Sequence, residues 1–179
     1  MKETRMIISG YGGQGVLLLG KIIAEAAMRE GRHVTYLPAY GAEVRGGTAN
    51  CMVCISDEEI GSPAVDEADV VVVLNEPSLT RFAGRLKKKG IMISNSSLVK
   101  GQLPVGSQSI AGAFTDIAAK LGNARVANMV CLGTFVAGTK LIQSQTVKQI
   151  LTEFSAKINP QLARNNAQAV AAGSDLVKG

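Results

Sequence analysis

The chain contains no tryptophan, and aromatic residues make up only 4% of its 179 residues. Proteins that bind single-stranded nucleic acid stack bases on aromatic side chains, so this scarcity argues against that class. No apolar run approaches the roughly 20 residues that a membrane-spanning helix needs. The chain also opens without a secretory signal, because Met1–Arg5 lead directly into a strand-like segment, and we therefore expect a cytoplasmic protein.

Cysteine and histidine are scarce as well. Cys51, Cys54 and Cys131 are an odd number of thiols in a chain without an export signal, which favours buried, reduced thiols over disulfides. Cys51 and Cys54 form a C-x-x-C pair, but this spacing on a strand places them on opposite faces, and a zinc or iron–sulfur site needs four ligands. The only histidine, His33, has no suitable partner nearby in the sequence. We therefore predict neither a metal site nor a catalytic residue.

The formal net charge is +5, which is ordinary for a small domain. Its densest basic run, Lys87–Lys89, precedes Gly90, and we predict that the run ends a helix, where cations complement the helix dipole. No recognised nucleic-acid motif accompanies the run, so we expect no nucleic-acid partner.

Apolar segments with strand and helix character alternate along the chain and are followed by a helical tail. This order predicts the α/β class: a three-layer α/β/α domain with a mostly parallel or mixed sheet and a helical C-terminal tail, folded as a single domain over residues 1–179. Strand, helix and strand in residues 6–38 predict a parallel β-α-β unit. Lys21, Glu25 and Arg29 recur at helical spacing in an otherwise apolar helix and predict one solvated stripe. The expected strands are 6–9, 33–38, 48–56, 70–74, 91–94 and 105–110, and the expected helices are 16–30, a helix from 75, 117–121, 126–138, a helix from 146, and one from 160 to about Gly173.

A glycine-rich loop lies between the first strand and the first helix. Glycine at 10, 12 and 15 permits a tight turn, close approach of a ligand to the backbone, and close packing of helix on strand. N–H groups at the start of the helix would face an anionic group of a ligand. The candidate site residues in this loop are Gly10, Gly12, Gly13, Gln14 and Gly15. The alternative is a purely structural glycine turn.

A second polar loop contains Glu43, Arg45, Gly46 and Gly47. Loops at strand ends of an open α/β sheet converge on one crevice, so we expect this loop to share a site with the first. An internal ion pair that ties the two loops together is the alternative interpretation. Asn128 is also a candidate ligand contact, but we favour a capping or core hydrogen bond as its role.

Together these segments resemble one family, the gamma subunits of 2-oxoacid:ferredoxin (acceptor) oxidoreductases. The similarity covers nearly the whole chain, and the paired loops are far more specific than either alone. The matching segments are Gly10–Gly15, Tyr40–Gly47, Ser62–Pro63, Leu121–Asn123, Asn128–Met129, Leu132–Gly133 and Asn166.

The resemblance implies a subunit that is not redox-active itself. In the family, alpha and beta subunits, with a delta subunit in some assemblies, bind thiamine diphosphate, magnesium and iron–sulfur clusters, pass electrons to ferredoxin, and transfer an acyl group to coenzyme A. For this chain it implies a role in assembly and in coenzyme A binding, with the Gly12–Gly15 and Arg45–Gly47 segments as contacts. We favour 2-oxoglutarate as the oxoacid, with pyruvate, branched-chain oxoacid and indolepyruvate enzymes as further possibilities.

Two other hypotheses come from different functional classes. An autonomous NAD-binding module, regulatory or dehydrogenase-like, would use the glycine loop, but Tyr36–Tyr40 supply no acidic residue to hold the ribose. A purely structural interaction subunit would bind no small molecule and would gain stability only with its partners.

Overall fold

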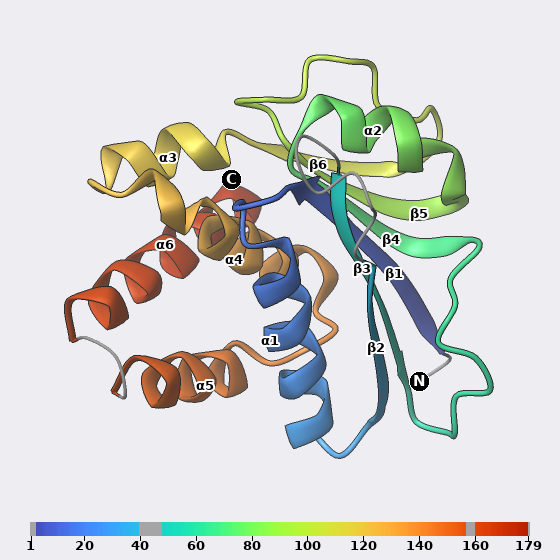
Figure 1. Ribbon diagram of the computed structural model, residues 1–179, viewed down its shortest axis with the longest axis horizontal. Helices are drawn as coiled ribbons and strands as arrows, with labels where there is room; N and C mark the ends of the chain where they lie inside the picture. Colours follow the sequence, from blue (N-terminus) through green and yellow to red (C-terminus); the bar gives the residue numbers. More distant parts are fainter. Residues whose placement is uncertain (1–2, 40–47, 157–159, 179) are drawn as a thin grey trace.

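A computed structural model describes residues 3–39, 48–156 and 160–178. Six strands form one mixed sheet in the order β2-β3-β1-β4-β5-β6 (Figure 1). The strands are β1 (Thr4–Tyr11), β2 (His33–Ala39), β3 (Thr48–Ser56), β4 (Ala68–Val73), β5 (Leu86–Asn95) and β6 (Gln108–Gly112).

Strands β1, β4, β5 and β6 are parallel to one another, whereas β3 runs antiparallel between β1 and β2. The predicted α/β fold with a mixed sheet is confirmed, and β1, α1 and β2 form the predicted parallel β-α-β unit, although β2 is not hydrogen-bonded to β1. Strand β3 pairs with β1 instead, with a register from Thr4 opposite Ile55 to Tyr11 opposite Thr48. Its side chains are buried on both faces from Val53 to Ser56, which suits a central strand.

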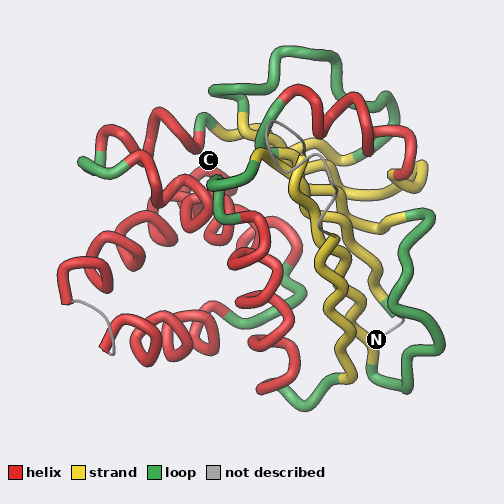
Figure 2. Tube along the Cα trace, in the orientation of Figure 1, coloured by secondary structure: helices red, strands yellow, loops and turns green. Residues whose placement is uncertain are grey.

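Six helices and two short 3-10 segments surround the sheet (Figures 1 and 2). One face is covered by α1, α3, α4, α5 and α6, whose apolar side chains join the larger core; the other face packs against α2 and the loops around Val65 and Val99. The helices are α1 (Val16–Arg29), α2 (Glu76–Phe82), α3 (Phe114–Lys120), α4 (Ala127–Thr139), α5 (Ser144–Ala156) and α6 (Pro160–Lys178), and the 3-10 segments are η1 (Ala83–Arg85) and η2 (Ala124–Val126).

Helix α1 has the predicted polar stripe. Arg29 donates to Glu25 at 2.6 Å, the i,i+4 partner on the same helix, and to Glu153 of α5 at 2.7 Å. The stripe therefore faces solvent while also linking α1 to α5.

Two sequence-based boundaries are wrong. Lys87–Lys89 lie within strand β5 rather than at a helix end, because α2 stops at Phe82 and the chain re-enters the sheet at Leu86. Helix α6 continues through Gly173 to Lys178, and this glycine packs against the backbone of α4 at Val130 instead of ending the helix. In the described segments, no helix is both long and apolar enough to cross a bilayer.

Candidate functional site

The carboxyl ends of three parallel strands, β1, β4 and β5, lie together at one end of the sheet. There β1 leads into the glycine loop, β4 into Leu74 and Asn75, and β5 into the loop that begins after Asn95. In open α/β sheets this end is where ligands bind.

The glycine loop turns through backbone conformations that only glycine accommodates easily. Gly13 and Gly15 have φ values of 93° and 73°, in the left-handed region that favours glycine. Gly10 is buried, and a Cβ there would come within 2.8 Å of Val16 on α1, so this glycine permits close packing of helix on strand. Gly12 and Gly13 are exposed, and an added Cβ at either would meet nothing within 4 Å. The loop therefore presents bare backbone on its outer side.

The amino terminus of α1 suits an anionic ligand group. Among the described residues, no side chain caps this end, and no acidic residue lies in the first turn. The first-turn N–H groups carry the positive end of the helix dipole, which stabilises negative charge placed there.

Gln14 uses both ends of its side chain within the loop. Its Oε1 accepts from the Tyr11 amide at 2.6 Å and from Asn75 Nδ2 at 3.1 Å, and its Nε2 donates to the Leu74 carbonyl at 3.2 Å. Gln14 therefore fixes the path of the loop against the end of β4.

Two buried asparagines extend this arrangement, and the sequence analysis did not identify them. Asn75 also caps α2, because its Oδ1 accepts from the Ser78 amide at 2.9 Å. Asn95 donates to the Leu74 carbonyl at 3.3 Å and to Thr115 Oγ1 at 2.9 Å. Each asparagine is 1% exposed. Asn75 lies two residues after β4 and Asn95 is the last residue of β5, and a polar residue at the end of a buried apolar run is the signal that could have identified both.

Asn128 approaches the loop from α4. It is 5% exposed and donates from Nδ2 to the Gly15 carbonyl at 3.3 Å. A Cβ on Gly15 would collide with the Asn128 side chain, so this asparagine and this glycine fit only as a pair. The hydrogen-bonding interpretation of Asn128 is confirmed.

The second predicted loop, with Glu43, Arg45, Gly46 and Gly47, lies outside the described residues. The strand ends that flank it are described, and Thr48 lies opposite Tyr11 at the start of the glycine loop.

All three cysteines are buried and free, as predicted. Cys51 and Cys54 belong to the two separate core clusters, so they lie on opposite faces of the sheet. Burial raises the pKa of the Cys51 thiol to about 12 and raises the pKa of Cys54 and Cys131 as well, so the thiols are protonated near neutrality. Within the described ranges, no three His, Cys, Asp or Glu side chains group as metal ligands do.

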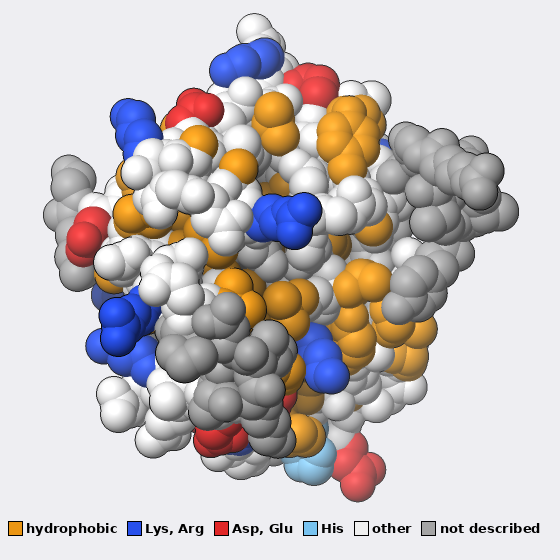
Figure 3. Space-filling model, turned by 60° about the vertical axis from the view of Figure 1, so that its left-hand side comes forward, with side chains coloured by type: hydrophobic (Ala, Val, Ile, Leu, Met, Phe, Trp, Pro, Cys, Tyr) orange, Lys and Arg blue, Asp and Glu red, His pale blue; other side chains and the backbone are white. Residues whose placement is uncertain are grey.

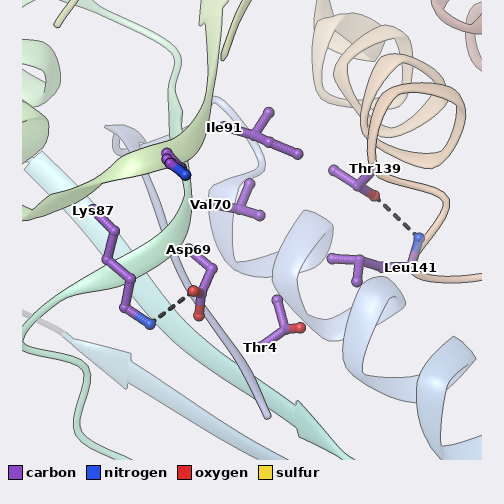
Figure 4. Close-up of a pocket in the computed structure, with 9 residues that line it drawn as sticks. Thr4, Asp69, Val70, Lys87, Ile91, Thr139 and Leu141 are labelled. Carbon is purple, nitrogen blue, oxygen red and sulfur yellow. Dashed lines mark hydrogen bonds and ion pairs between the residues drawn. The ribbon is translucent and has the colours of Figure 1, made fainter. Parts of the chain in front are cut away.

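A small cavity of about 300 Å³ lies at the opposite, amino end of the parallel strands (Figure 4). Its carboxylate, Asp69, accepts from Lys87 Nζ at 2.7 Å and from the Arg5 amide at 2.9 Å. Both carboxylate oxygens are thus engaged in joining β4 to β5 and β1, which is a structural role.

Comparison with known proteins identifies the class. Residues 5–176 match the family described as pyruvate ferredoxin/flavodoxin oxidoreductase, and the chain belongs to this family. By length and fold it corresponds to the family's gamma subunits. The crystal structure of the keto/oxoacid ferredoxin oxidoreductase gamma subunit from Geobacter sulfurreducens superposes with a TM-score of 0.82 at 28% identity and 99% coverage of both chains.

Two relatives differ in length. The ketoisovalerate oxidoreductase subunit VorA of Methanothermobacter marburgensis is 38% identical over 99% of this chain, but the chain spans only 37% of VorA. The 2-oxoglutarate synthase subunit KorC of the same organism is 32% identical, and the match covers 98% of this chain and 96% of KorC.

Proposed function

We propose that the chain acts as the gamma subunit of a multi-subunit, thiamine diphosphate-dependent 2-oxoacid:ferredoxin oxidoreductase of the cytoplasm. In this reaction a 2-oxoacid loses CO2, its acyl group forms a thioester with coenzyme A, and the two electrons released pass to ferredoxin. Thiamine diphosphate, magnesium and iron–sulfur clusters belong to the alpha, beta and any delta subunits.

The role of this chain is to complete the assembly and to bind part of coenzyme A. The single observation that carries this proposal is the open backbone of Gly12 and Gly13 beside the uncapped amino terminus of α1. A phosphate group of coenzyme A matches such a site in charge and in its need for N–H donors. Glu43 and Arg45 with Gly46 and Gly47 remain proposed contacts from the second loop.

A charge placed in the loop tests the coenzyme A role in the reconstituted complex. Gly12→Asp adds a carboxylate where a side chain has room and where φ is not in the left-handed region, so we expect the half-saturating coenzyme A concentration to rise about tenfold through repulsion of the phosphates. Gly61→Asp is the matched control, because Gly61 is equally open but lies in the loop between β3 and β4. If both variants require the same coenzyme A concentration as the parent, this chain does not bind the cofactor through the loop.

Two oxoacids are supported by different observations. KorC, a 2-oxoglutarate synthase subunit, matches this chain over nearly the full length of both, which favours 2-oxoglutarate. VorA, a ketoisovalerate oxidoreductase subunit, shows the higher identity, which favours a branched-chain oxoacid as the second candidate. Assaying the purified complex with a panel of 2-oxoacids, coenzyme A and a viologen dye distinguishes them.

An NAD-binding module fits the fold less well. Antiparallel β3 separates β2 from β1, and the described end of β2 is Pro38 and Ala39, which offer no carboxylate to a ribose. Titration with NADH checks this alternative, since stoichiometric binding by the isolated chain would favour it.

A further inference from the structure

A groove of about 1000 Å³ lies between α4, α5 and α6, away from the glycine loop. Four buried apolar side chains line it: Val136 on α4, Ile142 between α4 and α5, Leu151 on α5 and Val170 on α6. The groove is at the upper end of the size range of ligand pockets, and its lining is mainly apolar.

The α6 side of the groove is lined by short side chains. Ala163, Ala167 and Ala171 follow one another at intervals of four residues, so they share one helical face over about 12 Å. Ala167 and Ala171 are exposed. Because each side chain is a single methyl group, the backbone of another helix can lie close against this side.

The charged residues that line the groove are Lys140, Lys148 and Asp175, all exposed, so the net charge of the lining is positive. Figure 3 turns toward the viewer the side of the molecule on which α5 and α6 lie, and it shows hydrophobic patches interspersed with Lys and Arg side chains. An occupant therefore needs an apolar surface together with carboxylates.

We propose that this groove binds an amphipathic helix of a different polypeptide, with apolar residues at i, i+3, i+4 and i+7 against α5 and α6 and with acidic residues facing Lys140 and Lys148. A second copy of this chain is disfavoured, because it has a net charge of +5 and would bring like charges to the rim. The proposal goes beyond coenzyme A binding and does not depend on it.

Photo-crosslinking within the native complex tests the proposal. Ala167→Cys on one side of the groove and Thr152→Cys on the other each add an exposed thiol for a benzophenone label, while the native cysteines are buried. We expect both labels to attach to the same segment of another polypeptide, and mass spectrometry to show that this segment has helical apolar spacing and Asp or Glu residues. Ala119→Cys, an exposed alanine on α3, is the control position.

Charge reversal supplies the second readout. The double change Lys140→Glu and Lys148→Glu replaces attraction by repulsion, and we expect it to lower the crosslinking yield at Ala167→Cys about fivefold. The same reversal at Lys88, exposed on β5, should leave that yield unchanged, and circular dichroism of the isolated variants checks their folding. Attachment to a second copy, a yield no higher than at the control position, or a yield unaffected by the double reversal would overturn the proposal.

Discussion

Gln14 shows how one side chain fixes the glycine loop. It supplies an acceptor to the Tyr11 amide and a donor to the Leu74 carbonyl, two backbone groups at strand ends. Asn75 holds Gln14 in this orientation and caps α2 through its other amide atom. The loop is therefore held in place before any ligand arrives, which lowers the entropic cost of binding.

Asn75→Ser separates the two functions of this residue. Serine still caps a helix well, but it lacks the Nδ2 donor to Gln14, so we expect the free energy of unfolding to fall by about 1–2 kcal/mol. Asn123→Ser is the control, because Asn123 caps η2 through a bond from the Arg125 amide and should lose only about 0.5 kcal/mol. Urea denaturation measures both, and equal losses would show that Asn75 acts only as a cap.

Because burial raises the pKa of two thiols, we expect the free energy of unfolding to decrease at alkaline pH. The pKa of Cys51 is raised by burial from 9.0 to about 12, and the pKa of Cys131 is also raised by burial. The folded state therefore keeps its thiol protons when the unfolded state has lost them, so the stabilisation is complete below pH 9 and decreases as the pH rises toward 12, by at most about 1.4 kcal/mol per pH unit for each thiol.

Urea unfolding of the parent and of Cys51→Ala between pH 8 and pH 11 measures this contribution. We expect the variant to show a shallower decrease than the parent, by about 1 kcal/mol per pH unit above pH 9. Identical slopes would mean that Cys51 ionises normally in the folded chain.

At the scale of elements, two glycines allow the backbones of α4 and α6 to pack closely against each other. A Cβ on Gly133 would collide with the Val170 carbonyl, and a Cβ on Gly173 would collide with the Val130 carbonyl. Thr134 Oγ1 donates to the Gly173 carbonyl at 3.0 Å, and Ser174 Oγ donates to the Gly133 carbonyl at 3.3 Å. Such close packing fixes the position of α6 and therefore of one side of the groove.

Gly173→Ala should push the two helices apart. We expect a net loss of about 2–3 kcal/mol, even though alanine favours a helix by about 1 kcal/mol over glycine. Gly84→Ala is the matched control, since Gly84 is exposed, an added Cβ would meet nothing within 4 Å, and the change should be neutral or slightly stabilising. Thermal unfolding compares them, and a stable Gly173→Ala chain would show that the helices separate at little cost.

On the scale of the whole molecule, the chain offers a binding edge on one end of its sheet and a cationic groove between helices. Neither contains a cluster of metal ligands among the described residues. Under the proposed function, this chain contributes binding surface, and the redox chemistry belongs to the other subunits.

We therefore expect the isolated chain not to reduce a viologen dye when given 2-oxoglutarate and coenzyme A, whereas the purified complex does. Dye reduction, followed spectrophotometrically with each preparation at matched concentration, makes the comparison. Turnover by the chain alone would contradict the assignment of the redox centres to its partners.

The α/β class, the glycine loop, the polar stripe of α1 and the buried thiols could be predicted from the sequence, because each is a local pattern: periodicity, turn chemistry or spacing along one element. The position of β3 between β1 and β2 could not be predicted from the sequence. Which strand pairs with β1 depends on long-range packing, and both β2 and β3 follow β1 in the sequence as possible partners. The end of the second helix was also predicted wrongly, because β5 already pairs with β4 at Leu86, opposite Ala68, so Lys87–Lys89 belong to a strand.

Only the tertiary structure brought Gln14, Asn75, Asn95 and Asn128 to one edge, because the hydrogen bonds that connect the separate elements there span 20 to 113 residues and follow no sequence period. Local preferences therefore determined which segments became strands, helices and turns. Long-range packing decided which of those segments became neighbours, and with that decision it built both the candidate site and the groove.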